Sequence, residues 1–156
     1  MINILFVCLG NICRSPMAQA IFEEKLRAER LENKISVDSA GTGNYHIGDQ
    51  PDPRTINILK SKGIKFRHAA RQASKEDADK FDYIVAMDLS NHDDLRQLLP
   101  EDYENLYLMR EFDSVDRDSN VPDPYFGGED GFENVYDILD RTLDRFLEKV
   151  KLDHSL

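Results

Sequence analysis

Hydrophobic positions in this chain follow two spacings in turn, and the alternation predicts strands that are each followed by a helix. Four short apolar runs are typical of buried parallel strands, and they span residues 2–7, 35–39, 83–87 and 106–109. Apolar residues recur at helical spacing at 16–31, 54–61, 88–99 and 132–150, with a short capped helix expected at 74–77. The pattern predicts an α/β fold: a three-layer, open, doubly wound sheet of four parallel strands with helices on both faces.

The loop after the first strand is the most informative part of the sequence. The strand ends near Cys8, and Ser15 followed by Pro16 predicts a helix N-cap and the first helical residue. The loop must therefore curl over a helix N-terminus, where unpaired backbone N–H groups and the helix dipole favour an anion. Gly10 and Asn11 tolerate the left-handed backbone that turns successive N–H groups inward.

Side chains of the same loop add the chemistry of a phosphate site built around a thiolate. Arg14 carries a planar guanidinium that can bind two phosphate oxygens at once. The positive field of the loop favours the thiolate form of Cys8, and Ser15 can donate a hydrogen bond to that thiolate. The loop therefore predicts a nucleophilic cysteine beside a bound phosphate group.

Composition narrows the class of protein. The chain has 156 residues, 40% apolar and 32% charged, which fits a single domain spanning residues 1–156. A formal net charge of −10 and a pI near 4.8 argue against nucleic acid or an anionic membrane surface as the main partner. The early apolar run at 4–9 is too short for a signal-peptide core or a membrane span, so we expect a cytoplasmic protein. The two cysteines are too few and too close for a disulfide framework, and no neighbouring histidine indicates a zinc site.

Two long polar loops, at residues 40–53 and 112–131, are of the kind that carries function in a compact domain. In the second loop Asp123 lies between Pro122 and Pro124, which restrict the backbone around one carboxylate. A carboxyl group held in this way can reach the pocket and act as a general acid. The other acidic residues of this part of the loop are expected to be solvated charges: Asp113, Asp116 and Asp118.

Motifs from both ends of the chain together resemble one protein family. Cys8-x5-Arg14-Ser15 near the N-terminus and Asp123-Pro124-Tyr125 near the C-terminus resemble the low-molecular-weight protein tyrosine phosphatases. Three further segments agree in order and spacing: SAGTG at 39–43, HAARQ at 68–72 and FDYIVAMDLSN at 81–91. The resemblance covers nearly the whole chain, whereas a bare Cys-x5-Arg match would carry little weight.

The resemblance implies strand order 2-1-3-4 and hydrolysis of phosphotyrosine through a cysteinyl-phosphate intermediate, without a metal or cofactor. It assigns the nucleophile to Cys8, phosphate binding to Arg14 and the general acid to Asp123. The remaining loop residues are expected to surround the phosphate: Leu9, Gly10, Asn11, Ile12, Cys13 and Ser15. We expect a monomer whose partners are tyrosine-phosphorylated proteins and whose product is inorganic phosphate.

The resemblance also implies aromatic walls for the cleft. Tyr45 and Tyr125 are expected on these walls, where a flat ring stacks against phosphotyrosine. His46 and Gln50, beside Tyr45, are candidates for tuning substrate choice. Without the resemblance, each of these residues would be interpreted as an ordinary exposed loop side chain. Whether they lie around the pocket in the structure decides between the two interpretations.

Four more residues are expected to support the loop or its chemistry. Ser39 and His68, with Asn11 of the loop itself, resemble members of a hydrogen-bond network that, in the family, holds the phosphate loop in shape. Cys13 is either a packing residue or a protective thiol that traps oxidised Cys8 as a disulfide. Asp88 is expected to cap the helix that follows it, which is a structural role.

Three other functions fit part of the pattern. Arsenate reductase of the thioredoxin-coupled type shares the fold and loop but needs further cysteines, and this chain has none after Cys13. A protein arginine phosphatase of the same superfamily typically has threonine at the loop position of Ile12, and the bulkier apolar side chain favours an aryl phosphate. A phosphoprotein-binding module without turnover is disfavoured because Cys8, Arg14 and Asp123 are all present.

Overall fold

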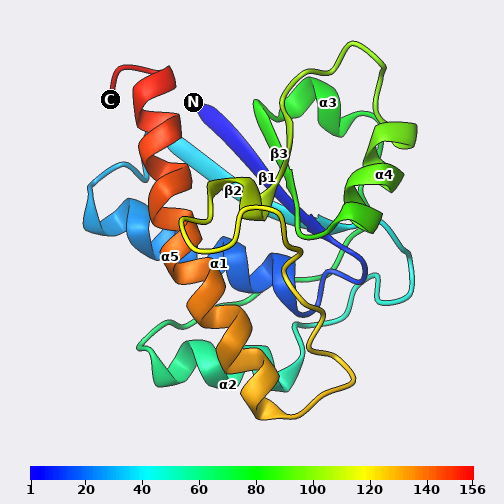
Figure 1. The fold of residues 1–156 in the computed structure, drawn as a ribbon, viewed down its shortest axis with the longest axis vertical. Coiled ribbons are helices and arrows are strands. Elements are labelled where there is room, and N and C mark those ends of the chain that lie inside the picture. Colours follow the sequence, from blue (N-terminus) through cyan, green and yellow to red (C-terminus); the bar gives the residue numbers. More distant parts are fainter.

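Four parallel strands form the centre of the protein, and helices cover both faces of the sheet (Figure 1). The structure is a computed structural model that describes all of residues 1–156. The strands are β1 (Ile2–Cys8), β2 (Ile35–Gly41), β3 (Tyr83–Ala86) and β4 (Leu106–Leu108). The helices are α1 (Arg14–Ala28), α2 (Pro53–Ser61), α3 (Asp77–Lys80), α4 (Leu89–Leu98) and α5 (Glu129–Asp153), with a 3₁₀ helix, η1 (Met109–Phe112). The strand order β2-β1-β3-β4, parallel throughout, confirms the predicted sheet.

Side chains of the central strand β1 alternate between two hydrophobic clusters, one on each face of the sheet. Phe6 belongs to the larger cluster, which packs the sheet against α1, α2 and α5. Its ring packs edge-on against Phe22 of α1, with centroids 5.7 Å apart, and lies 6.0 Å from the ring of Phe146 of α5. Leu5 and Val7 belong to the smaller cluster, together with residues of α4. Burial on both faces explains why β1 is apolar at nearly every position.

The start of α1 differs from the prediction. Cys13 is the N-cap residue and Arg14 the first helical residue, so the assignment of Ser15 as N-cap and Pro16 as first helical residue is wrong. The Ser15 side chain makes hydrogen bonds inside the preceding loop instead of capping the helix. Pro16 is tolerated in the first turn because the N–H that proline lacks has no intrahelical partner there.

Other helix boundaries shift by a few residues. Helix α1 ends at Ala28 rather than at 31, since Arg30 has a left-handed φ of 58° and ends the helical backbone. Helix α5 begins at Glu129, ahead of the predicted start at 132, with two acidic side chains in its first turn. The same helix continues to Asp153, past the predicted end at 150. None of the helices has the length and apolar composition needed to cross a membrane.

The carboxyl ends of β1 and β3 lie side by side, and the helices that follow them, α1 and α4, cover opposite faces of the sheet (Figure 1). This is the topological switch point, where open parallel sheets bind their ligands. Cys8 is the last residue of β1, and Asp88 immediately precedes α4 beyond the end of β3. The fold therefore places the two residues at the same edge of the sheet.

Candidate active site

The β1–α1 loop, residues 8–15, turns back over the first turn of α1, as the sequence predicts. Asn11 has a φ of 58° and provides the left-handed position of this turn. Gly10 does not have a positive φ, so the prediction of a left-handed backbone there is wrong. The absence of a side chain at Gly10 serves close packing instead, because a Cβ atom would lie 3.0 Å from Cδ2 of His46.

Gly41, at the end of β2, lets the β1–α1 loop pack directly on the backbone of that strand. A Cβ atom at Gly41 would lie 2.6 Å from the carbonyl oxygen of Leu9 and 3.2 Å from the backbone nitrogen of Asn11. The next two residues continue the contact, since their N–H groups donate to the carbonyls of Cys8 and Leu9 at 2.9 Å. No side chain fits at Gly41 without moving the loop, which gives a steric reason for the glycine in the SAGTG segment.

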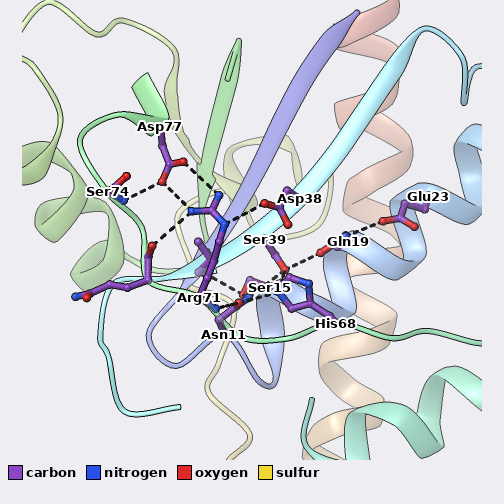
Figure 2. Close-up of polar contacts among 12 residues, drawn as sticks. Asn11, Ser15, Gln19, Glu23, Asp38, Ser39, His68, Arg71, Ser74 and Asp77 are labelled. Carbon is purple, nitrogen blue, oxygen red and sulfur yellow. Dashed lines mark hydrogen bonds and ion pairs between the residues drawn. The ribbon is translucent and has the colours of Figure 1, made fainter. Parts of the chain in front are cut away.

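The side-chain amide of Asn11 is fully buried and uses its whole hydrogen-bonding capacity (Figure 2). Its Nδ2 donates to Oγ of Ser15 at 2.8 Å and to Oγ of Ser39 at 3.0 Å. Its Oδ1 accepts from the backbone N–H of Arg71 at 3.1 Å and from Nε2 of His68 at 2.8 Å. Burial lowers the pKa of His68, which keeps the ring neutral with its proton on Nε2. The structure thus brings Ser39 and His68 together around Asn11.

The network continues beyond Asn11 in two directions (Figure 2). In one, the hydroxyl of Ser39 donates to Gln19 at 2.7 Å, and the Gln19 amide donates to Glu23 at 2.8 Å. In the other, the guanidinium of Arg71 donates to the carboxylate of Asp38 on β2 at 3.0 Å and to both oxygens of the buried Asp77 at 3.2 Å. Charged groups on α1, β2 and α3 therefore anchor the amide that fixes the β1–α1 loop.

Cys8 and Ser15 are buried and adjacent, with Sγ and Oγ 3.0 Å apart. The Ser15 oxygen already accepts a hydrogen bond from Asn11, and its one hydrogen can be donated to the sulfur at 3.0 Å or to the carbonyl of Ala40 at 3.3 Å. Both cysteines of the chain are free thiols. The pair can therefore place a hydrogen-bond donor on a thiolate, as the sequence predicts.

Arg14 crosses from the β1–α1 loop to the loop that carries Asp123. Its NH1 donates to Asp88 at 2.6 Å and to the carbonyl of Val121 at 3.0 Å, and its NH2 lies 3.7 Å from Oδ2 of Asp123. Burial of the side chain, which is 3% exposed, would lower the pKa of Arg14. The charge of Cys8 and the bond to Asp88 outweigh burial and raise that pKa, so the guanidinium keeps its charge beside the sulfur.

Asp88 does more than the sequence analysis expects. Its Oδ1 accepts from the N–H of Asn91 at 2.8 Å, which confirms the predicted cap of α4. Its Oδ2 holds Arg14, a contact that the sequence analysis does not predict. The position of Asp88 directly after a strand, at the ligand-binding edge of the sheet, is the signal that could have identified it.

None of the backbone N–H groups of residues 9–15 donates a hydrogen bond to an acceptor within the protein. Residues 14 and 15 lie in the first turn of α1, where backbone N–H groups have no intrahelical partner and the helix dipole is positive. The loop therefore combines free donors with the buried guanidinium of Arg14. Such a concave, positive nest binds an anion with oxygen acceptors, most simply a phosphate group.

A pocket of about 180 Å³ lies over the β1–α1 loop. It is lined by 11 residues: Cys8, Leu9, Gly10, Ile12, Cys13, Arg14, Tyr45, His46, Asp123, Tyr125 and Phe126. Tyr45 and Tyr125 line it from two different loops. His46 is also a lining residue, whereas Gln50 is not. Phe126, whose side chain is 94% exposed, is an aromatic lining residue that the sequence analysis does not identify.

Asp123 projects from the loop of residues 113–128, called the 113–128 loop below. Its side chain is 41% exposed and lines the pocket. One carboxylate oxygen accepts from the N–H of Tyr125 at 3.1 Å, and the other faces Arg14. A carboxyl group in this position can exchange a proton with a group bound in the pocket and with solvent.

Arg54 of α2 links the far end of the 113–128 loop to the β1–α1 loop. Its guanidinium donates to the carbonyls of Tyr125 and Gly127, both at 2.9 Å, and to Asp52 at 3.0 Å. The N–H of Asp52 in turn donates to the carbonyl of Ile12 at 2.8 Å. Burial would raise the pKa of Asp52, but the bonds from Arg54 outweigh it and lower that pKa. This link is not predicted from the sequence.

Cys13, the second thiol of the loop, lines the same pocket as Cys8. Burial, with the negative charges of Asp52 and Cys8, raises the pKa of Cys13 to about 12. Cys13 is therefore a neutral thiol at physiological pH, and the two cysteines of the loop lie in different electrostatic environments.

The prediction that Asp113 is a solvated charge is wrong. Its side chain is fully buried and forms ion pairs with Arg110 at 2.9 Å and Arg141 at 3.0 Å. Two arginines from outside the loop neutralise the carboxylate, which makes burial possible. Asp116 and Asp118 are exposed, as predicted.

Comparisons with known proteins agree with this geometry. A family model described as low molecular weight phosphotyrosine protein phosphatase matches residues 3–156. The low molecular weight phosphotyrosine protein phosphatase of Schizosaccharomyces pombe is 44% identical over 151 residues, which cover 96% of this chain and 97% of the relative. A crystal structure of a protein tyrosine phosphatase from Entamoeba histolytica, with Hepes in the active site, has a TM-score of 0.93 and 40% identity over 99% of both chains. A drosophila arginine phosphatase has a TM-score of 0.88 and 37% identity, over 95% of this chain and 97% of that one. This chain therefore belongs to the low molecular weight phosphotyrosine protein phosphatase family.

Proposed function

We propose that this protein hydrolyses phosphotyrosine on proteins in two steps, through a cysteinyl-phosphate intermediate and without a metal or cofactor. The observation that carries the proposal is the nest of free N–H groups at residues 9–15 around the sulfur of Cys8. Donors fixed in a buried loop hold the phosphate oxygens and stabilise the charge spread over them during phosphoryl transfer. Arg14 adds a charged donor to the same oxygens, and Asp88 keeps its guanidinium in place.

In the first step, the thiolate of Cys8 attacks phosphorus in line with the bond to the tyrosine oxygen. The S–P bond forms as that P–O bond breaks, and Asp123 gives its proton to the leaving phenolate oxygen. The hydroxyl of Ser15 supports the thiolate before attack, since it lies 3.0 Å from the sulfur. The position of Asp123 on the pocket lining, away from the buried base of the pocket, supports its role at the leaving-group side.

In the second step, the ionised carboxylate of Asp123 takes a proton from a water molecule. That water attacks phosphorus, the S–P bond breaks, and inorganic phosphate leaves with Cys8 restored as the thiolate. The partial exposure of Asp123 supports this reversal of roles, because the carboxylate must reach water once the phenol has left.

The side walls of the pocket support an aryl phosphate as the substrate. Tyr45 and Tyr125 line the pocket from two different loops, and a substrate ring can stack against such aromatic surfaces. Ile12 adds an apolar side chain to the lining beside the phosphate site. A guanidinium phosphate would place its polar nitrogen atoms against the same surfaces and leave them without partners.

A panel of peptides of one sequence, carrying phosphotyrosine, phosphoserine or phosphoarginine, tests the substrate. With a chelator present, we expect kcat/KM for phosphotyrosine to exceed that for the other two by roughly a hundredfold. The matched variant Ile12→Thr should lower the ratio of kcat/KM for phosphotyrosine to kcat/KM for phosphoarginine, because a hydroxyl then faces the bound group. Faster release from phosphoarginine by the unaltered protein would establish an arginine phosphatase instead. Release that stops on chelation would exclude the metal-free mechanism.

We also propose that the enzyme works as a monomer in the cytoplasm. Cys8, Arg14 and Asp123 line one pocket together, so the proposed mechanism needs no residue from a second copy. The nucleophile must be a free thiol, and a reducing compartment maintains it in that state. Sedimentation of the active protein and fractionation of cells that express it test the two statements separately.

A further inference from the structure

The 113–128 loop has to place one carboxyl group, Asp123, without the help of regular structure. No helix or strand lies between Phe112 and Glu129, and most side chains of the loop are exposed. A misplacement of about 1 Å at a reacting group can cost a hundredfold in rate. The contacts that fix this loop therefore determine how well Asp123 can transfer a proton.

The middle of the loop is fixed at two neighbouring residues. The N–H of Val121 donates to the carbonyl of Met87 at 2.9 Å, and its carbonyl accepts from Arg14. Asn120 uses its side-chain oxygen to accept the N–H of Leu89, the first residue of α4, at 3.0 Å. Only Pro122, with its restricted backbone, separates this fixed point from Asp123. The position of residues 120 and 121 therefore determines where the carboxyl group of Asp123 lies.

The root of the loop is a buried carboxylate shared by two arginines. Asp113 accepts from Arg110 at 2.9 Å, from Arg141 at 3.0 and 3.1 Å, and from the N–H of Val115 at 2.9 Å. Burial alone would raise the pKa of Asp113, but the bonds from Arg141, Val115 and Arg110 outweigh it and lower that pKa to about 2. Asp113 is therefore ionised at neutral pH.

Arg110 differs from Arg141 in two contacts, of which the first is a long ion pair at 3.9 Å with the exposed Asp116. Arg141 donates to Asp113 alone, whereas NH1 of Arg110 also donates to the backbone carbonyl of Asn120 at 3.1 Å. Arg110 itself is 8% exposed and sits in η1, directly after strand β4 of the sheet. Its guanidinium therefore connects the rigid sheet and the buried carboxylate to the segment three residues before Asp123.

We propose that Arg110, held by Asp113, is a positioning residue that sets the reach of Asp123 toward the leaving group. The inference rests on the proposed role of Asp123 as proton donor. Arg110 does not line the pocket, and its contact nearest to Asp123 in the loop is the bond to the carbonyl of Asn120. Loss of this bond removes one of the four hydrogen bonds that hold residues 120 and 121, so Asp123 is placed less precisely. Proton transfer then weakens, and the phosphate nest around Cys8 is unchanged.

The test compares Arg110→Lys with the matched control Arg141→Lys. Each variant keeps a positive charge beside Asp113, but a single ammonium nitrogen at residue 110 cannot span both the carboxylate and the Asn120 carbonyl. Rates are measured as kcat/KM with two esters, phenyl phosphate and 4-nitrophenyl phosphate. Phenolate needs a proton to leave, whereas nitrophenolate is a much better leaving group and needs little help. Melting temperatures of both variants report on any general loss of stability.

For Arg110→Lys we expect kcat/KM to fall about tenfold or more for phenyl phosphate and about twofold or less for 4-nitrophenyl phosphate. For Arg141→Lys we expect both rates within about twofold of the original, with a similar fall in melting temperature. Arg110→Gln, which leaves Asp113 paired with Arg141, provides a second variant should lysine disturb folding. Equal changes for the two esters in the Arg110 variants would overturn the positioning role.

Asp123→Asn separates this inference from the proposed function. If Asp123→Asn lowers both esters equally, Asp123 is not the proton donor, and both proposals fail together. If Asp123→Asn is selective for phenyl phosphate and the Arg110 variants are not, only the positioning role fails. In the double variant, Arg110→Lys should add no further selective loss, because the group through which it acts is already gone.

Discussion

The two loops that meet at the pocket are held in opposite ways. In the β1–α1 loop every residue is buried except Leu9 and Gly10, and one amide, that of Asn11, makes four hydrogen bonds. The 113–128 loop is mostly exposed, and long side chains from other segments hold it at separate points. These side chains are Arg110 and Arg141 at its root, Arg14 in its middle and Arg54 at its far end.

The difference fits the two tasks that the proposed mechanism gives to the loops. Donors for a phosphate group stabilise the transition state best when they are fixed before the substrate arrives. A proton donor has to face the leaving phenol in one step and water in the next, so its loop must remain open to solvent. Damage to the β1–α1 loop should therefore affect every substrate, whereas damage to the 113–128 loop should affect only esters whose leaving group needs a proton.

The largest expected effect is that of Cys8→Ser, which separates binding from chemistry within the β1–α1 loop. Turnover should fall by at least about 10⁴-fold, because a serine hydroxyl without an adjacent base is a poor nucleophile. The backbone N–H groups and Arg14 remain, so calorimetry should still detect binding of inorganic phosphate or vanadate. Activity within tenfold of the original would contradict the assignment of Cys8 as nucleophile.

Asp123→Asn tests the opposite loop. The variant keeps the shape of the side chain but has no proton to give, so kcat/KM for phosphotyrosine should fall by roughly 10²–10⁴-fold. The rate with 4-nitrophenyl phosphate should fall much less, since its leaving group needs little protonation. Stopped-flow measurement of phenol release gives both rates, and an equal loss for the two esters would count against the acid role.

Asn11→Gly sharpens the comparison from the side of the β1–α1 loop. Glycine accepts the left-handed φ of 58° without strain, so the variant removes the four hydrogen bonds and leaves the backbone preference intact. Buried partners lose their bonds, and we expect kcat/KM to fall by roughly tenfold to a hundredfold together with a lower melting temperature. The loss should be the same for phenyl and 4-nitrophenyl phosphate.

Asn11→Ala is the matched control, because it removes the same side chain but adds strain at the left-handed position. It should be less active and less stable than Asn11→Gly. A loss confined to the ester with the poorer leaving group, in either variant, would mean that the two loops do not have separate tasks.

Much of this molecule follows from sequence patterns within short segments. The order of strands and helices follows from apolar spacing, and Cys8 and Arg14 are identified by the loop between a strand and a helix. The start of α1 cannot be predicted in the same way. Ser15 could serve either as an N-cap or as a hydrogen-bond donor to the sulfur, and the local sequence does not distinguish the two roles.

Contacts between distant residues account for the other failures. Asp113 resembles the neighbouring exposed acids in sequence, and only the tertiary fold brings Arg141 to it from 28 positions away. The same applies to Arg54, whose bonds to the 113–128 loop span more than 70 positions. Such partners have no fixed spacing that a sequence reader could recognise, whereas the second role of Asp88 was open to inference from the sheet edge.

Cys13→Ser is expected to have the smallest effect on basal activity. Its expected effect on recovery of activity after oxidation is much larger. Peroxide should oxidise the Cys8 thiolate first, because Cys13 is a neutral thiol whose pKa burial and nearby negative charges raise to about 12. Conversion of Cys8 to a neutral sulfenic acid removes one of those charges. The Cys13 sulfur can then displace hydroxide from the sulfenic sulfur, which forms a disulfide and releases water.

In the unaltered protein this disulfide should protect Cys8 from further oxidation, and a thiol reductant should restore activity. In Cys13→Ser, basal hydrolysis should persist, whereas recovery after peroxide should drop sharply, because the sulfenic acid proceeds to irreversible products. Activity assays before and after reductant, with mass spectrometry of the oxidised protein, measure both effects. Full recovery of the variant, or no Cys8–Cys13 linkage in the oxidised original, would leave Cys13 as a packing residue, and the β1–α1 loop would then protect its nucleophile by burial alone.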